Sequence, residues 1–139
     1  EFGHTAVGGA LPDGSRRSTL RGLSSGALIV GDQGAGTLDI DVGGLVAFLD
    51  DTIIANGVGS EGTVNVRDVY EINGNTYRSE LEVLGGQAAT LVVGREGRGV
   101  LNIQRGALVE TSANAYLSMF ADGHSEAIES SSGIKERAT

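Results

Sequence analysis

Hydrophobic and polar residues alternate with a period of two at several places along the chain. Residues 38–42 read Leu-Asp-Ile-Asp-Val, residues 64–67 read Val-Asn-Val-Arg, and residues 101–104 read Leu-Asn-Ile-Gln. This period puts alternate side chains on opposite faces of a β-strand, so that one face can be buried while the other stays wet. The pattern therefore predicts short strands separated by turns that contain Gly.

The chain contains an internal repeat. Residues 27–46 and 90–109 are identical at ten of twenty positions, without a gap, at a constant offset of 63. All ten matched positions are Gly or aliphatic, whereas most of the unmatched ones are polar. A weaker copy lies at residues 53–66. What repeats is therefore a backbone scaffold rather than a set of chemically active side chains.

The first copy is expected to hold three short strands, at residues 28–30, 37–42 and 45–48, and the next copy begins near Ile53. Three strands at this spacing predict an all-β fold, a short parallel β-solenoid of roughly four to five coils. A β-sandwich also uses short alternating strands and is the alternative, but the strands of a sandwich rarely repeat in sequence.

One segment interrupts the repeat. Strand-like runs at residues 69–72 and 76–82 flank Asn73-Gly74-Asn75, which is a strong hairpin signal. We therefore expect residues 69–84 to form a β-hairpin inserted into the second coil.

The rest of the chain divides by composition. Residues 1–24 are expected to form an N-terminal arm or a leading coil, and residues 25–123 the solenoid that carries the hairpin. Residues 124–139 are poor in apolar side chains and are expected to be a polar C-terminal tail.

Composition excludes several classes of protein. Gly supplies 23 of the 139 residues, and because each Gly inside a helix costs about 1 kcal/mol, a helical bundle is disfavoured. The chain has no Cys, which excludes a disulfide scaffold and a thiol nucleophile. No apolar run approaches the ~18 residues of a transmembrane helix. The net charge of −8 predicts repulsion from nucleic acid and from anionic membranes.

The repeated run has the form Leu-x-Val-Gly-x-x-Gly-x-Gly-x-Leu-x-Ile, followed by Gly-x-Leu-Val, at residues 28–46 and 91–109. It resembles the passenger-associated β-helix repeats of autotransporters, which are bacterial surface adhesins. Residues 53–66 carry the resemblance in part, and the three segments together cover less than half of the chain. The resemblance implies a right-handed parallel β-helix, exported to the bacterial surface, with a structural or adhesive role.

Four carboxylates are candidates for a cation site or an acid–base pair. Asp39 and Asp41 share one outward strand face, and Asp50 and Asp51 follow at the next corner. The other copies lack carboxylates at the places of the first pair, so we interpret these residues as a solvated acidic face. With two His and no Cys in the chain, we expect no metal site and no cofactor.

The predicted hairpin carries the best candidates for binding, which are Tyr70, Tyr77 and Arg78. Aromatic and Arg side chains on a protrusion suit recognition of a host protein or a glycan. The alternative is that they cover the wall of the solenoid.

The sequence favours a non-enzymatic structural or adhesive module outside the cell, at the bacterial surface. Its open sheet edges are expected to pair with another copy of the chain or with neighbouring solenoid segments. A glycan- or protein-binding module that uses the hairpin is the alternative. A polysaccharide-acting enzyme is a third hypothesis, but it would need clustered Asp, Lys or Arg on one wall, and the chain has a single Lys.

Overall fold

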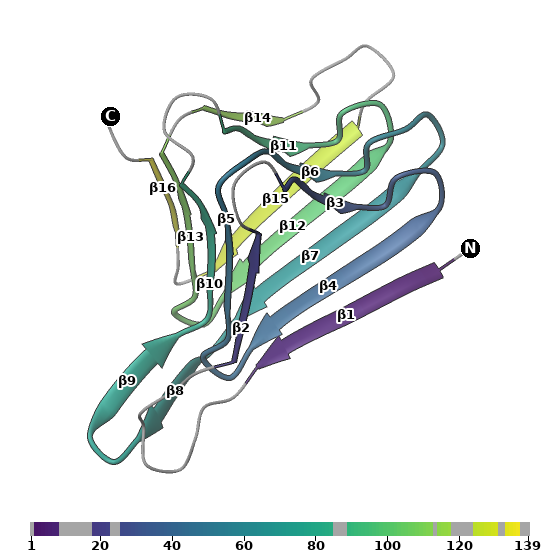
Figure 1. Cartoon of the computed structure of the whole chain (residues 1–139). Coiled ribbons are helices and arrows are strands. Elements are labelled where there is room, and N and C mark those ends of the chain that lie inside the picture. The colour runs from purple at the N-terminus through teal and green to yellow at the C-terminus, as the bar shows by residue number, and fades with distance from the viewer. Residues whose placement is uncertain are drawn as a thin grey trace.

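A computed structural model of the chain describes residues 2–8, 18–22, 26–84, 89–112, 114–117, 124–130 and 133–136. Every regular element in these ranges is a β-strand, which confirms the all-β class (Figure 1). These ranges contain no helix of the length and apolarity needed to cross a membrane.

Sheet I is built from seven-residue strands in the order β1-β4-β7-β12-β15, with every neighbouring pair parallel. Its strands are β1 (Phe2–Gly8), β4 (Ala35–Asp41), β7 (Glu61–Arg67), β12 (Arg98–Gln104) and β15 (His124–Ser130).

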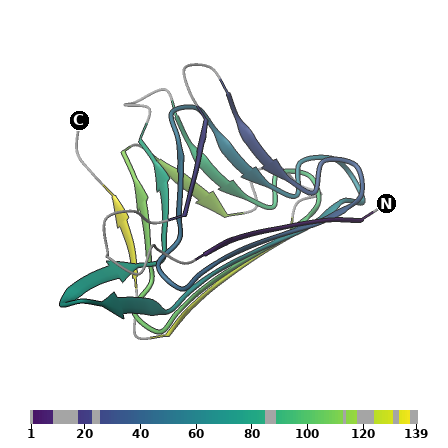
Figure 2. The same ribbon diagram turned by 60° about the horizontal axis from the view of Figure 1, so that its bottom comes forward.

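Two further parallel sheets have shorter strands. Sheet II has the order β16-β13-β10-β5-β2 and sheet III the order β14-β11-β6-β3. The strands of sheet II are β2 (Thr19–Gly22), β5 (Leu45–Phe48), β10 (Glu80–Val83), β13 (Leu108–Thr111) and β16 (Gly133–Glu136). The strands of sheet III are β3 (Leu28–Val30), β6 (Thr52–Ile54), β11 (Leu91–Val93) and β14 (Ala115–Leu117). The chain visits sheets I, II and III in turn, and the three sheets enclose a common core (Figure 2).

An antiparallel ribbon leaves the sheets between β7 and β10 (Figure 1). It consists of β8 (Val69–Ile72) and β9 (Asn75–Arg78), which pair with Tyr70 opposite Tyr77.

This topology corrects two expectations, the short parallel β-solenoid predicted from the repeat and the right-handed β-helix implied by the resemblance, whereas the predicted hairpin is present as β8 and β9. The strands form four separate sheets, three parallel and one an antiparallel hairpin. The reason lies in the segments that join one sheet to the next, here called corners. Gly43 and Gly106 have φ of 78° and 84°, and Val42 and Arg105 before them have φ of 48° and 51°. Such left-handed residues end a strand, so the ladder of sheet I stops at these corners.

The strand limits also differ from those predicted. Residues 28–30 and 45–48 are strands as expected, but the strand predicted at 37–42 begins at Ala35 and ends at Asp41. The run predicted as the second arm of the hairpin is split at Ser79, which is buried. The Oγ of Ser79 accepts a hydrogen bond from the N–H of Gly43 at 3.0 Å.

Because of this split, the antiparallel ribbon ends at Arg78 and the residues after Ser79 join sheet II as β10. The segment expected to be an N-terminal arm or leading coil contains β1 and β2. The segment expected to be a polar tail contains β15 and β16.

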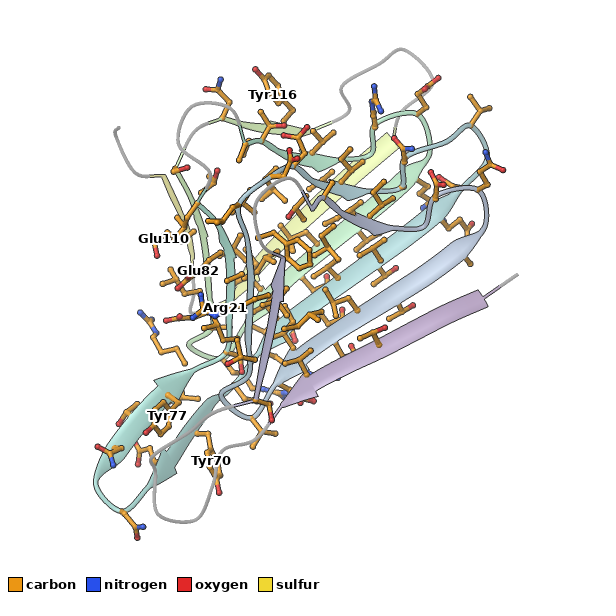
Figure 3. All side chains as sticks on the ribbon, viewed as in Figure 1. Arg21, Tyr70, Tyr77, Glu82, Glu110 and Tyr116 are labelled. Carbon is orange, nitrogen blue, oxygen red and sulfur yellow. The ribbon has the colours of Figure 1, made fainter. Side chains whose placement is uncertain are left out.

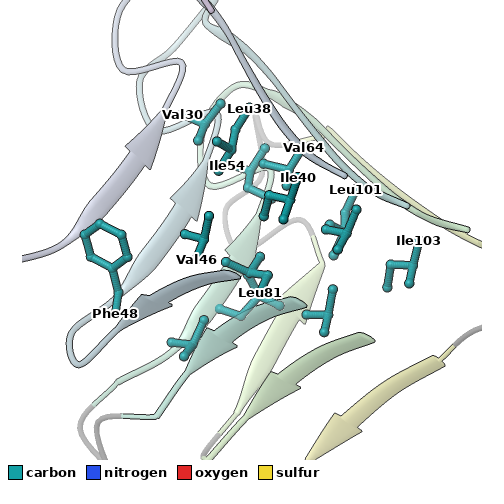
Figure 4. Close-up of a cluster of buried hydrophobic side chains, with 14 of the residues drawn as sticks. Val30, Leu38, Ile40, Val46, Phe48, Ile54, Val64, Leu81, Leu101 and Ile103 are labelled. Atoms are coloured by element: carbon teal, nitrogen blue, oxygen red, sulfur yellow. The ribbon is translucent and has the colours of Figure 1, made fainter. Parts of the chain in front are cut away.

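The core lies between the three sheets and is aliphatic except for Phe48 (Figure 4). Parallel register stacks similar side chains, so that Ile40, Val66 and Ile103 lie side by side on β4, β7 and β12, all fully buried. Each such side chain contributes about 1.5–3 kcal/mol by leaving water. Burial in this core explains why the copies of the internal repeat share their aliphatic positions.

Candidate functional site

The ribbon brings the three predicted binding residues together (Figure 3). Tyr70 and Tyr77 lie opposite each other and are half-buried. The Cβ atoms of both lie 2.9 Å from where a Cβ on Gly43 would stand, so the pair packs against this corner. Arg78 is exposed, and its Nε donates to the carbonyl of Gly106 at 2.7 Å. The two tyrosines and this hydrogen bond fasten the base of the ribbon to the sheets.

The tip of the ribbon is exposed. Glu71 and residues 73–76 are exposed and line a shallow hollow. A partner would therefore meet the tip and the outer side of Arg78 rather than the tyrosine pair.

A polar ladder runs across the outer face of sheet I. Asn65 Nδ2 donates to Asp39 Oδ1 at 2.7 Å, and Asn102 Nδ2 donates to Asn65 Oδ1 at 2.7 Å. Arg67 Nη2 lies 3.5 Å from Asp39 Oδ1 and 3.9 Å from Asp41 Oδ2. The two carboxylates are thus partners in a side-chain network, which fits the solvated-face interpretation better than an acid–base pair.

Removing the middle of this ladder tests its contribution. We expect Asn65→Ala to lower the free energy of unfolding by about 1–2 kcal/mol, because two hydrogen bonds of about 0.5–1.5 kcal/mol each are lost. Urea unfolding followed by circular dichroism measures this. The matched control is Thr63→Ala, two residues earlier on the same strand. Equal effects of the two substitutions would contradict a structural role for the ladder.

The remaining candidate carboxylates also serve the fold. Asp51 Oδ1 accepts hydrogen bonds from the N–H of Thr90 at 2.9 Å and from its Oγ1 at 3.1 Å. Asp50 Oδ1 accepts from the N–H of Asp51 at 2.7 Å. The two His are placed far apart, on the opposite edge strands β1 and β15 of sheet I. Within the part of the chain that the structure describes, no group of three or more His, Cys, Asp or Glu is arranged to hold a metal ion.

Three carboxylates gather on the outer face of sheet II, a cluster that the sequence analysis did not single out. Glu82 on β10 lies opposite Glu110 on β13 (Figure 3). Glu80 lies two residues before Glu82 on β10. Burial raises the pKa of Glu82 above its ordinary value of 4.5, and the nearby carboxylates of Glu80 and Glu110 raise it further. Arg21, on β2, lowers it. The cluster is therefore a place where ionisation opposes folding.

This shift makes stability depend on pH. Folding raises the pKa of Glu82, so ionisation of this side chain lowers the free energy of unfolding. This loss of stability is absent below pH 4.5 and grows as pH rises through the pKa of the folded state. We expect Glu82→Gln to be more stable than the parent at pH 7, by about 0.2–1 kcal/mol, the size of a cross-strand charge pair. The gain should vanish near pH 3.5.

Urea unfolding at both pH values measures the effect, with Glu71→Gln on the exposed ribbon as the control. A Glu82→Gln variant that gains nothing at pH 7 would show that the clustered charges carry no cost.

In the part of the chain that the structure describes, no further strand lies beside either end of the parallel sheets, and these ends are here called open. At one end lie β1, β2 and β3, here called the N-terminal edge strands, and at the other lie β14, β15 and β16, the C-terminal edge strands. Among the described strands, each of these six has a neighbour on one side only. Unpaired edges of parallel strands can accept a further strand.

A cavity of about 380 Å³ opens at the N-terminal edge strands. Its lining comes from β1, β2, β3, β4 and the corner between β3 and β4. The aliphatic part is formed by Leu20, Leu28, Val30 and Leu38. Thr5, Asp32, Gln33 and Thr37 also line it, so the cavity joins the aliphatic end of the core to a polar rim.

Comparison of the chain with protein-family models, with curated proteins and with solved structures found no match. The resemblance to autotransporter repeats accordingly remains a prediction.

Proposed function

We propose that the chain is a non-enzymatic structural module that extends by pairing its open sheet edges with further parallel strands, from a second copy or from neighbouring segments. The observation that carries this proposal is the pair of open edges at opposite ends of all three parallel sheets. The location, at the bacterial surface, and an adhesive use rest on the resemblance of the repeats.

The backbone of β3 supports this proposal at atomic level. Leu28 N donates to Asp51 O at 2.9 Å, and Ala55 N donates to Val30 O at 2.8 Å, so these two residues of β3 face β6. Alternate residues of a parallel strand face opposite neighbours, so the N–H and C=O of Ile29 face the open side. An added strand would find a donor and an acceptor there.

The outer faces support a role without catalysis. On sheet I the polar side chains bind one another along the ladder of Asp39, Asn65 and Asn102. A second ladder follows the corners between sheets III and I, where Asn56 Nδ2 donates to Asp32 Oδ1 at 2.7 Å and Arg95 Nη1 to Asn56 Oδ1 at 2.9 Å. These networks join strand to strand along the direction in which the sheets would grow.

The test removes the open donor of β3 without touching its bonds to β6. Proline is tolerated on an edge strand when its nitrogen faces outward, so Ile29→Pro should fold. Light scattering over a micromolar concentration series should show a mass that rises with concentration for the parent and for Ile29→Ala, and a lower mass for Ile29→Pro. A monomeric parent at every concentration would overturn self-pairing, and an unchanged mass for Ile29→Pro would exclude this edge.

The ribbon gives a second candidate, a protein- or glycan-binding module, because its exposed tip projects away from the sheets (Figure 1). The variant to test is Asn75→Ala combined with Thr76→Ala, since Tyr77 packs against a corner and its loss would change stability. Host-protein and glycan panels should bind the parent and lose binding to this variant. Equal binding by both proteins would exclude the tip.

A further inference from the structure

One column of sheet I has glycine at four of its five positions, and the fifth position, on β15, is Ser125. Gly3, Gly36, Gly62 and Gly99 are aligned by the register of β1, β4, β7 and β12. Each is the second residue of its strand. Glycine in the middle of a sheet is unfavourable unless another part of the backbone comes close.

Three of these glycines show that close approach. A Cβ on Gly36 would lie 2.6 Å from the N of Gly31, and one on Gly62 would lie 2.6 Å from the N of Ala55. A Cβ on Gly99 would overlap the N of Gly94. All three contacts come from the residue that directly follows a sheet III strand. On β4, β7 and β12, glycine is thus required because the end of a sheet III strand crosses over sheet I at these positions.

The fourth glycine lacks this neighbour. A Cβ on Gly3 would meet nothing within 4 Å among the described residues. Gly3 instead lines the cavity of about 380 Å³, together with Leu28, Val30 and the open side of β3. Among the described residues, no sheet III strand occupies beside Gly3 the place that such a strand occupies beside the other three glycines.

The numbers of strands in the three sheets also indicate that sheet III lacks a strand beside β3. Among the described strands, sheets I and II have five each and sheet III has four. If β15 and β16 of one copy pair with β1 and β2 of the next, sheet III is left with a gap one strand wide, between β14 and β3. The cavity at Gly3 forms one side of this gap.

We infer that the cavity at the N-terminal edge strands binds an extended peptide strand of the form aliphatic-x-aliphatic-Gly. The strand pairs in parallel with β3 through Ile29, places its two aliphatic side chains over Leu28 and Val30, and brings its Gly beside Gly3. This form is the one that β3 and β11 have, Leu-Ile-Val-Gly and Leu-Val-Val-Gly. The inference rests on the proposed function, because it names the partner of the open edge in sheet III.

The test uses a fluorescein-labelled peptide with the sequence of residues 90–97, Thr-Leu-Val-Val-Gly-Arg-Glu-Gly. Fluorescence anisotropy should show saturable binding, with one peptide for each chain. The same peptide with Ser at the places of Leu91 and Val93 should not bind. On the protein side, Gly3→Val fills the space beside Gly3, and Ile29→Pro removes the N–H donor on the open side of β3. Each substitution should weaken peptide binding about tenfold or more. Thr63→Val and Ile29→Ala are the matched controls.

Light scattering on the same samples separates this inference from the proposed function. A protein that assembles but does not bind the peptide overturns the inference and leaves the proposed function standing. A protein that binds the peptide but stays monomeric supports the inference and contradicts self-assembly. Equal binding by the parent, by Gly3→Val and by Ile29→Pro would show that the peptide sits elsewhere and would overturn the inference.

Discussion

Substitution of Gly62 by Ala is expected to destabilise the chain by about 3 kcal/mol or more. A Cβ at this position would overlap the carbonyl oxygen of Val30 and would lie 2.6 Å from the N of Ala55. Both are backbone atoms held by hydrogen bonds at the end of sheet III strands, so they cannot move away without breaking the ladder. Overpacking costs typically 1–3 kcal/mol even where side chains can yield, and here the obstacle is backbone.

Gly3→Ala is the matched control, because it makes the same chemical change in the same column with no atom within 4 Å of the new Cβ. We expect its effect to stay within about 0.5 kcal/mol. Urea unfolding of the two variants beside the parent measures the difference. If Gly62→Ala were as stable as Gly3→Ala, the close crossing of sheet III strands over sheet I would be wrong.

Truncation of the core at Leu101 should have an effect of similar size. Leu101 is fully buried on β12 and in register with Val64 on β7. Leu→Ala changes in cores cost about 2–5 kcal/mol, since transfer free energy is lost and a cavity remains. Thermal or urea unfolding of Leu101→Ala checks this, with the half-exposed Leu49→Ala as the control, expected within about 0.5 kcal/mol. A loss no larger than that of the control would place Leu101 outside the core.

Period-two patterning and repeated glycines predicted the strands at 28–30 and 45–48, because these features depend on local burial alone. They did not predict that β4 begins at Ala35. Gly36 is typical of a turn, yet it lies within the strand because the backbone at Gly31 crosses over it. This requirement arises from packing between sheets, so it cannot be predicted from a short stretch of the sequence. The separation into four sheets likewise depends on left-handed corner residues such as Val42, which no propensity would place there.

The candidate site was predicted in part. The Asn-Gly-Asn signal located the ribbon, and with it Tyr70, Tyr77 and Arg78. The alternative interpretation, in which these side chains lie against the rest of the fold, agrees with the packing of Tyr70 and Tyr77 at Gly43. The contact with Gly43 itself could not be predicted, because it depends on where the corner lies. The sequence also showed that positions equivalent to Asp39 are Asn in later copies. Only parallel register turns these positions into a hydrogen-bonded ladder.

The carboxyl cluster on sheet II was missed for a related reason. Glu82 and Glu110 are 28 positions apart in sequence and become neighbours only through the pairing of β10 with β13. Their alternation with Leu81 and Val109 puts them on the face of sheet II that points away from the core, although Glu110 is itself buried. The alternation along each strand does not indicate which strands pair with each other.

We propose that this chain grows through the open edges of its parallel sheets. Negative-stain electron microscopy over a micromolar concentration series tests it most directly, because images distinguish growth along one axis from other association. We predict rods of one constant width whose length increases with concentration, since strands that add to the edges extend the sheets and leave their outer faces bare. Particles of single-molecule size at every concentration, or clusters of irregular width joined through the sheet faces, would contradict the account.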